Sequence, residues 1–356
     1  RAIDLEMMWF TSESEWESQF TEIGEKSTSK DSGDTVVPRI AWVEPLTDNL
    51  SFSFTFLGTS FSDDLGDWEG RYFITEYSSL FINAFPSLAY RINDRWSVAG
   101  SMIISYTDFE QERAVRNVFD PGFGDGKSEL EADSVEFGFG ASTLFQYSPQ
   151  TRFGLSYQSE IEPDRDADSS FSGLGPNTQA AFDSLGITDV DITLESTSPE
   201  SMTTGVYHEF DNGHALTLDL AWINFSNFRL SEYYFNGNAL VESNIQYEDI
   251  YAAAASWTFP VSDRWMLGVG GLATNEMLDD DERTMMLRLD ALWSLGVAAE
   301  WQWTDKRSIK MSVAYMGVGD APVTTGEIQG LGAYEGEFKS RDTWLIQIST
   351  NWGGGL

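Results

Sequence analysis

The sequence contains no cysteine, few basic residues and no long apolar run. The absence of cysteine excludes a disulfide scaffold and thiolate metal sites, and it fits a chain exported through an oxidising space. The 21 basic and 57 acidic residues give a formal charge of −36, which argues against nucleic-acid binding because phosphate contact needs clustered Lys and Arg. No apolar stretch approaches the roughly 18 residues of a transmembrane helix, and no signal peptide precedes Arg1. A mature exported protein and a cytoplasmic one both satisfy these limits.

The main pattern present is the strict alternation of polar and apolar residues. Between Asn93 and Glu110 one side of an extended chain carries Trp96, Val98, Gly100, Met102, Ile104 and Tyr106. The other side is small and polar, with only Ile103 out of step. The alternation recurs in residues 50–61, 136–147, 215–222, 251–259, 265–271, 291–303, 309–315 and 344–352. A period of two predicts β-strands with one apolar face, and helical periodicity is nearly absent.

The connections between these strands are of two kinds. Six are tight and rich in turn residues, at 47–49, 93–95, 148–150, 211–213, 261–263 and 304–306. Long polar stretches lie between them, near residues 13–35, 62–76, 114–133, 163–188, 231–246, 275–288 and 322–337. Short and long connections alternate, which predicts fourteen antiparallel strands with both termini at the short-turn end. This is the signature of a transmembrane up-and-down β-barrel with short periplasmic turns and long extracellular loops.

The alternative is a soluble β-sandwich, whose apolar faces meet in a core. Two observations favour the membrane barrel. The polar faces carry mainly Ser, Gly, Ala, Thr and Gln, which suit a crowded lumen better than an exposed sheet. Aromatic residues gather beside the short turns, as in an interfacial girdle: Tyr90, Trp96, Tyr147, Phe210, Phe259, Trp265, Trp301, Trp303 and Trp352.

Several stretches, in the same order along nearly the whole chain, resemble the long-chain fatty-acid transporter (FadL) family of Gram-negative outer membranes. They are PSLAYRINDRWSVAGS (86–101), GFGASTLFQYSPQTRFGLSYQSEIE (138–162), LAWINFSNF (220–228) and YAAAASWTFPVSDRWMLGVGGLA (251–273). The resemblance implies a fourteen-stranded barrel in the outer membrane that moves hydrophobic molecules toward the periplasm.

Two departures from the family concern the ends of the sequence. Family members open with a plug segment that fills the barrel from the periplasmic side, whereas this sequence starts at RAIDLEMMWF, which already has the pattern of the first strand. We therefore expect one barrel domain over residues 1–352, with a plug that is absent, removed or outside this sequence. Such barrels usually end on an aromatic residue, so we expect residues 353–356, which follow Trp352, to be a tail or a cloning remnant.

The resemblance also implies an external apolar groove held by the loops after the fifth and seventh strands. In the first loop the candidates are Val118, Phe119 and Phe123. In the second loop they are Phe182 and Leu185, on a short helix with Asn177 as N-cap and Gly186 as C-cap. Apolar residues in loops otherwise so polar suggest a ligand groove, and the alternative is that they only pack the two loops together.

Gly58 lies in the third strand, which family members kink to open a lateral window. It interrupts the alternation of phenylalanines, and a strand glycine often marks a bend; an ordinary strand glycine is the alternative.

Arg113 and Arg116 match the family's first basic group for a ligand carboxylate, with pairing to Glu110 and Glu112 as the alternative. Where the family has its second basic group, this chain has Tyr247, Glu248 and Asp249. If these acids line the pocket, neutral hydrocarbons should bind better than fatty acids.

Other chemistry has weak support. The acidic runs 164–168 and 279–282 depart from calcium-loop spacing, so we expect solvated acid, bridged at most by divalent cations to lipopolysaccharide. His208 and His214 flank a periplasmic turn without a serine nucleophile motif, so we expect no enzyme, no cofactor and no metal site.

The sequence thus predicts a passive outer-membrane channel for hydrophobic compounds, fatty acids or hydrocarbons, with membrane lipid, and detergent in preparations, as its surroundings. Two rivals are a water-filled diffusion pore and a non-transporting barrel that anchors a protein partner.

Overall fold

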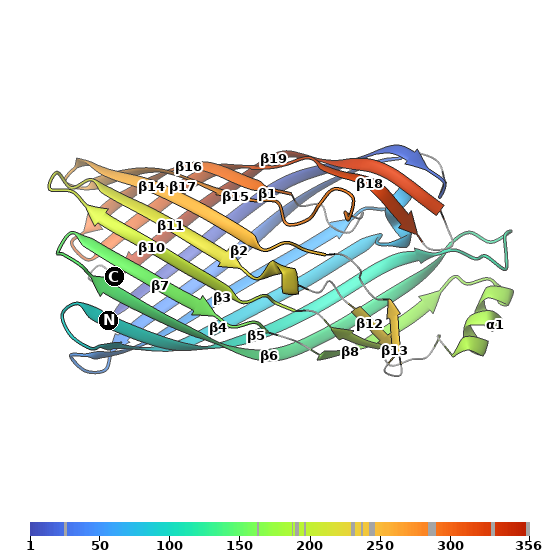
Figure 1. The fold of residues 1–356 in the computed structure, drawn as a ribbon, viewed down its shortest axis with the longest axis horizontal. Helices are drawn as coiled ribbons and strands as arrows, with labels where there is room; N and C mark the ends of the chain where they lie inside the picture. Colours follow the sequence, from blue (N-terminus) through green and yellow to red (C-terminus); the bar gives the residue numbers. More distant parts are fainter. Residues whose placement is uncertain are drawn as a thin grey trace.

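A computed structural model describes the chain apart from residues 25–26, 162–163, 187, 189–191, 196, 229–231, 236–237, 242–245, 284–289, 329–331 and 354–356. Its strands form a closed antiparallel β-barrel of fourteen strands that lie oblique to the long axis, with both chain ends near one end of the molecule (Figure 1). In the part of the chain that is described, no helix has the length and apolar character needed to cross a membrane.

Fourteen strands make the barrel wall, and β1 pairs with β19 to close it. They are β1 (Ala2–Thr21), β2 (Thr28–Pro45), β3 (Leu50–Asp64), β4 (Glu76–Arg91), β5 (Trp96–Val115), β6 (Gly126–Gln146), β7 (Thr151–Gln158), β10 (Ser201–Glu209), β11 (Ala215–Ile223), β14 (Ile250–Ser262), β15 (Trp265–Thr274), β16 (Leu292–Thr304), β17 (Arg307–Val318) and β19 (Gly332–Trp352).

The remaining elements lie in the half of the molecule that carries the long loops, away from the short turns (Figure 1). They are the 3-10 helices η1 (Glu69–Tyr72) and η2 (Phe225–Asn227), the helix α1 (Pro176–Leu185), and the strands β8 (Asp164–Ser172), β9 (Ile192–Glu195), β12 (Glu232–Phe235), β13 (Asn238–Val241) and β18 (Ala321–Ile328).

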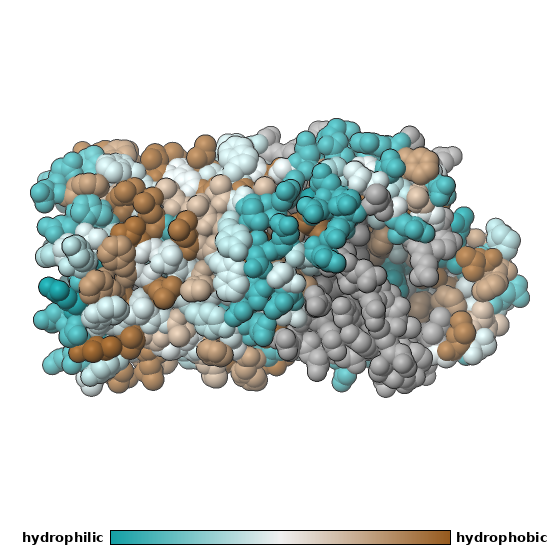
Figure 2. Space-filling model, viewed as in Figure 1, coloured by the Kyte–Doolittle hydropathy of each residue, from teal (hydrophilic) through white to brown (hydrophobic). Residues whose placement is uncertain are grey.

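The predicted alternation sets which side chains face out. On β5, Trp96, Val98 and Met102 are exposed on the outer surface, whereas Ile103 is buried in the lumen. Ile103 is the apolar residue that interrupts the predicted alternation, and its side chain lies inside the barrel among the luminal residues. Apolar side chains cover much of the wall near the short-turn end, and hydrophilic ones gather further toward the loops (Figure 2).

The short turns are confirmed, and their residues explain why the chain reverses there. Asn93 accepts hydrogen bonds at its side-chain oxygen from the N–H groups of Arg95 and Trp96, at 2.8 and 2.9 Å. Gly213 has a φ of 78°, which a glycine adopts without steric cost. Beside the turns, Trp301 stacks between two other tryptophans. Its ring centroid lies 6.2 Å from that of Trp265 and 6.3 Å from that of Trp303.

The predicted long loops are in part wrong. Residues 13–21 and 28–35 continue β1 and β2 as a paired hairpin, and residues 322–337 lie largely in β18 and β19. Ladder hydrogen bonds join backbone groups and need no apolar side chains, so the strands continue where the apolar alternation ends. Ion pairs support them there, as between Lys339 and Glu17 at 2.5 Å.

Candidate functional site

The ladder between β2 and β3 covers only part of these strands. It ends at the pair Arg39–Leu57, although β2 pairs with β1 as far as Thr28 and β3 pairs with β4 as far as Asp64. Pro38 and Gly58 stand immediately beyond the last pair. Proline has no N–H to donate to a ladder, which explains why the pairing stops at this position. We call this place, among the described residues 28–38 and 58–64, the β2–β3 parting.

Gly58 lies next to the last β2–β3 pair, but it does not bend β3 away from β4. The register from Leu50 opposite Tyr90 to Asp64 opposite Glu76 is unbroken through Gly58. A Cβ at this glycine would be 3.8 Å from the Pro38 ring, an ordinary contact. The ladder that is interrupted is the one between β3 and β2, not the one between β3 and β4.

The luminal face of β3, β4 and β5 carries aromatic side chains among small polar ones. The strand alternation and register place Phe61 and Phe81 on this face, with ring centroids 6.4 Å apart, and also Tyr77 and Phe109 at 5.6 Å. We call this surface, with Leu57, Phe85 and Ile103, the aromatic wall. Its luminal positions within residues 55–61, 77–87 and 101–111 carry no charged side chain, and β3 forms the edge of the β2–β3 parting.

The luminal face of β6, β7, β10 and β11 is different. It borders a cavity of about 520 Å³ lined by small residues, including Ser142, Ser156 and Thr203. The guanidinium of Arg152 lies 4.3 Å from the ring centroid of Tyr207 in the same cavity. This cavity, which Ala89 of β4 and Ser97 of β5 also line, is small-walled and polar where the aromatic wall is not.

Residues 65–75, which include η1, fold inward at the long-loop end of the barrel, and we call them the lid. On one side Trp68 packs against Trp16 of β1 and Phe338 of β19, at 6.2 and 6.3 Å. On the other side the Gln111 amide of β5 donates to the carbonyl of Phe73 at 2.9 Å. Gln111 shares the luminal side of β5 with Ile103, and β1 and β5 are four strands apart, so the lid reaches along the luminal side of the wall from β19 to β5.

The core of the lid is well buried. Trp16, Trp68 and Tyr334 are all at most 2% exposed, and the indole N–H of Trp16 donates to the buried carboxylate of Glu69 at 3.2 Å. Gly336 leaves room for the Trp16 ring, which would lie 2.3 Å from a Cβ at that position. This is the largest cluster of buried apolar residues in the described chain.

Beyond the lid, the loop at residues 116–125 and α1 form an apolar tip. Val118, Phe119, Phe123 and Leu185 are each more than half exposed, whereas Phe182 packs against Phe171 at 5.3 Å. The two segments are joined by polar side chains and not by these apolar ones. We call residues 116–125 the capture loop.

Two buried polar residues of the capture loop hold α1. The amide of Asn117 donates to the carbonyls of Gly124 and Gly173 and accepts from the N–H of Gly175. Asp120 accepts from the N–H of Thr178 and from the Asn177 amide, each at 2.7 Å. Burial opposes ionisation of Asp120, but these donors lower its pKa overall.

The predicted N-cap was wrong and the C-cap was right. Gly175 occupies the N-cap position, Pro176 follows it, and Asn177 points to Asp120 of the capture loop. Asp120 supplies from outside the helix the oxygen that an N-cap side chain normally provides. Gly186 ends α1 with a left-handed φ of 69°.

Arg113 and Arg116 are both exposed near the mouth. Neither pairs with Glu110 or Glu112 among the described contacts: Glu112 binds Lys127 at 2.5 Å, and Glu110 accepts from Ser78. Arg116 is close enough to the lid for its charge to act on Tyr72.

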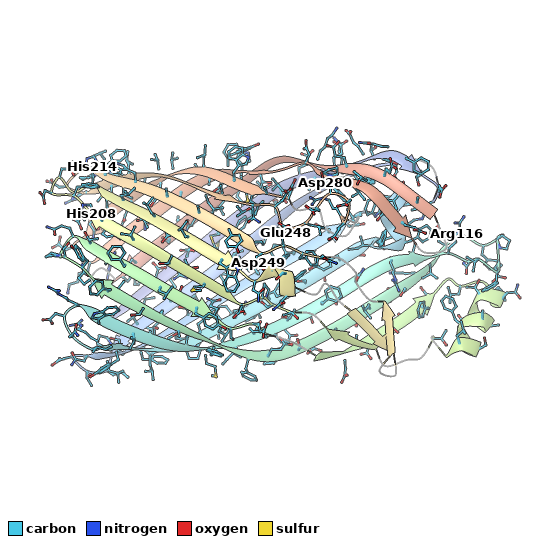
Figure 3. All side chains as sticks on the ribbon, viewed as in Figure 1. Arg116, His208, His214, Glu248, Asp249 and Asp280 are labelled. Carbon is cyan, nitrogen blue, oxygen red and sulfur yellow. The ribbon has the colours of Figure 1, made fainter. Side chains whose placement is uncertain are left out.

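The acidic pair Glu248 and Asp249, which we expected at the place of the family's second basic group, lies apart from Arg116 (Figure 3). Asp249 accepts from the Trp222 indole at 2.8 Å and from the N–H of Ser226, and these bonds lower its pKa. Glu248 is exposed, and Tyr247 is buried against Phe225 and Phe228; burial raises the pKa of Tyr247 to about 12. Asp249 and Tyr247 are thus held in loop packing.

The two histidines lie at the short-turn end (Figure 3). Nδ1 of His208 is 2.8 Å from the Thr151 hydroxyl, and His214 lies against Trp257 and Phe259. Among the described residues, no three His, Asp or Glu side chains converge to hold a metal ion.

The family model "Outer membrane protein transport protein (OMPP1/FadL/TodX)" matches residues 3–352. The chain belongs to this family. It is an outer-membrane β-barrel, as the sequence predicted, and its family is one of transport proteins. The long-chain fatty acid transport protein of Escherichia coli O6:H1 is 23% identical over 92% of this chain and 79% of its own length. That of Escherichia coli K12 is 22% identical over 89% of this chain and 76% of its own length.

Solved structures show the same fold at low identity. A Pseudomonas aeruginosa FadL homologue has a TM-score of 0.84 at 16% identity and covers 100% of this chain and 91% of its own. The toluene transporter TodX of Pseudomonas putida has a TM-score of 0.69 at 14% identity, with coverages of 100% and 90%.

In this FadL-family barrel, sequence reasoning missed the lid and the β2–β3 parting. Leu65, Trp68 and Tyr72 are apolar residues in an otherwise polar stretch, which is the signal that could have indicated a buried segment. Pro38, inside a predicted strand, could have indicated an interrupted ladder.

Proposed function

We propose that this protein takes up a hydrophobic compound at the apolar tip and releases it through the β2–β3 parting into the bilayer. The observation that carries the proposal is the aromatic wall, because it lines the lumen as far as the edge where β3 stops pairing with β2. An apolar ligand gains by leaving water along such a surface. Relatives described as fatty acid and toluene transporters support an apolar ligand.

The aromatic wall favours an uncharged ligand or an uncharged part of one. A carboxylate moved along it would lose hydration without gaining a cationic partner from residues 55–61, 77–87 or 101–111, which is costly. Arg113 and Arg116 stand at the mouth, where a polar head group would be held before the chain enters. We therefore expect dodecan-1-ol to enter the lumen more readily than dodecanoate at neutral pH.

A bridge across the β2–β3 parting tests the release route. Val37 of β2 and Thr59 of β3 each lie two residues beyond the last pair, Arg39–Leu57. The strand alternation places both side chains on the luminal side. The chain has no native cysteine, so a short bifunctional thiol reagent should join Val37→Cys specifically to Thr59→Cys. Uptake of dodecan-1-ol into lipid vesicles should then stop.

The matched control joins Val43→Cys to Ser53→Cys with the same reagent. This pair lies on the same luminal side but within the intact ladder, so uptake should continue. Continued uptake with residues 37 and 59 bridged would contradict the lateral route.

A water-filled diffusion pore is the second candidate, and the polar cavity beside Arg152 favours it. A steady single-channel ion current with the lid in place would support the pore, and uptake through a pore would be insensitive to either bridge.

A further inference from the structure

The lid and the capture loop are joined by one carboxylate. Asp125, at the end of the capture loop, accepts from Nε of Arg71 at 3.0 Å and from the Tyr72 hydroxyl at 2.8 Å. Arg71 also donates to the Tyr72 hydroxyl at 3.0 Å, and its guanidinium lies 4.5 Å from the centroid of that ring. Asp125, Arg71 and Tyr72 form a compact cluster that we call the latch.

The latch is partly buried, which makes its bonds more directional than those of an exposed ion pair. The Arg71 and Asp125 side chains are 24% and 28% exposed, and burial together with the bond to Asp125 raises the pKa of Tyr72. The Tyr72 hydroxyl therefore keeps its proton and remains a donor. Arg71 also contacts Asp67 at 3.4 Å, but Asp67 is 91% exposed and belongs to the lid itself.

Asp125 lies next to the apolar part of the capture loop. Phe123 is two residues away and more than half exposed, and Asp120, five residues away, fixes the loop to α1. An apolar compound that covers Phe123 and Phe119 contacts a loop whose far end holds the lid. Tyr72 and Trp68 belong to the same buried cluster, so a displaced Tyr72 loosens the packing that closes the mouth.

We propose that Asp125 is a positioning residue that couples ligand capture on residues 118–123 to opening of the lid. This rests on the proposed function, since it assumes an apolar ligand on the capture loop. In the closed state Asp125 holds Arg71 and Tyr72 down, and a ligand that shifts the loop weakens these bonds. The lid then moves off the mouth. A ligand shifts such an equilibrium only by its difference in affinity between the two states.

A single cysteine below the lid reports its opening. Ser142 lines the luminal cavity, and Ser142→Cys changes one atom in a chain that lacks cysteine. On intact cells, a bulky membrane-impermeant maleimide added outside labels residue 142 only when the mouth is open. Labelling is measured with and without dodecan-1-ol.

The expected result is that dodecan-1-ol speeds labelling several-fold in the parent, and that Asp125→Asn labels faster without the alcohol and responds little to it. Tyr72→Phe removes one of the two hydrogen bonds to Asp125. Its labelling rate without the alcohol should lie between those of the parent and Asp125→Asn. Asp133→Asn makes the same change of charge at an exposed outer position of β6 and should behave as the parent.

An Asp125→Asn protein that responds to dodecan-1-ol as strongly as the parent overturns the coupling. The migration of the folded barrel on unheated gels, together with the Tyr72→Phe variant, shows whether a lost response reflects misfolding. If dodecan-1-ol fails to bind the parent in a direct binding measurement, the proposed function fails, and this outcome is distinct from binding without lid opening.

Discussion

Removing the central side chain of the lid should open the mouth without altering the barrel wall. Trp68 belongs to the lid, is 2% exposed, and packs edge-on against Trp16. Its indole N–H donates to the carbonyl of Ile74 at 2.8 Å. Truncation of a buried tryptophan to alanine costs about 3–5 kcal/mol. Because Trp68 is buried only when the lid is docked, most of this cost falls on the closed state.

At about 1.4 kcal/mol for each factor of ten, Trp68→Ala should raise the open-to-closed ratio of the lid by roughly two to three and a half powers of ten. The assay is the rate at which an external impermeant maleimide labels Ser142→Cys. When closing is faster than labelling, the rate follows the open fraction. Labelling should therefore accelerate at least about a hundredfold, until the reagent itself becomes limiting.

The control is Trp303→Ala, which removes the same side chain from an exposed position on the outer girdle. It should leave the labelling rate unchanged. If Trp68→Ala migrates as a folded barrel yet labels Ser142→Cys at the parent rate, the lid does not close the mouth, and our account of residues 65–75 is refuted.

Three further outcomes follow from the contacts described. Asn117→Ala leaves the buried N–H of Gly175 without its partner, at a cost of about 1–3 kcal/mol, and removes the bonds to the carbonyls of Gly124 and Gly173, so limited proteolysis should cut α1 faster, with Ser184→Ala as an exposed control. The pKa of Asp120 is lowered in the folded state, so its contribution is complete above its unfolded pKa near about 4 and is lost as the pH falls through the folded value; α1 should become protease-sensitive only under acid conditions, and Asp120→Asn should abolish that pH dependence. Gly336→Ala should destabilise the lid by about 1–3 kcal/mol because its Cβ would meet the Trp16 ring, whereas Gly154→Ala, with open space around it, should be neutral in thermal unfolding.

Sequence reasoning gave the barrel but not its extracellular end. The period of two and the turn residues depend on neighbours along the chain, so both the strand count and the side of the termini could be predicted. The extension of β1 and β2 beyond the membrane could not be predicted, because strands with water on their outer face need no alternation of apolar residues. The burial of Trp68 depends on Trp16 and Phe338, which lie far away in sequence.

The same distinction applies to the site. The exposed apolar residues of the capture loop were predicted, because hydrophobic residues in a polar loop are visible in the sequence. The oxygen that caps α1 was assigned to Asn177 but comes from Asp120, 57 residues earlier. Asp249 looked like a lining group until its bonds to Trp222 and Ser226 located it in the loop packing.

The seam between the first and last strands has a consequence for biogenesis. Ile3 lies opposite Trp352, so closure joins segments separated by almost the entire polypeptide. Contacts of such long sequence separation form slowly. A nascent chain that lacks β19 would present two unpaired edges, which are templates for aggregation. The barrel therefore cannot close before β19 has been synthesised.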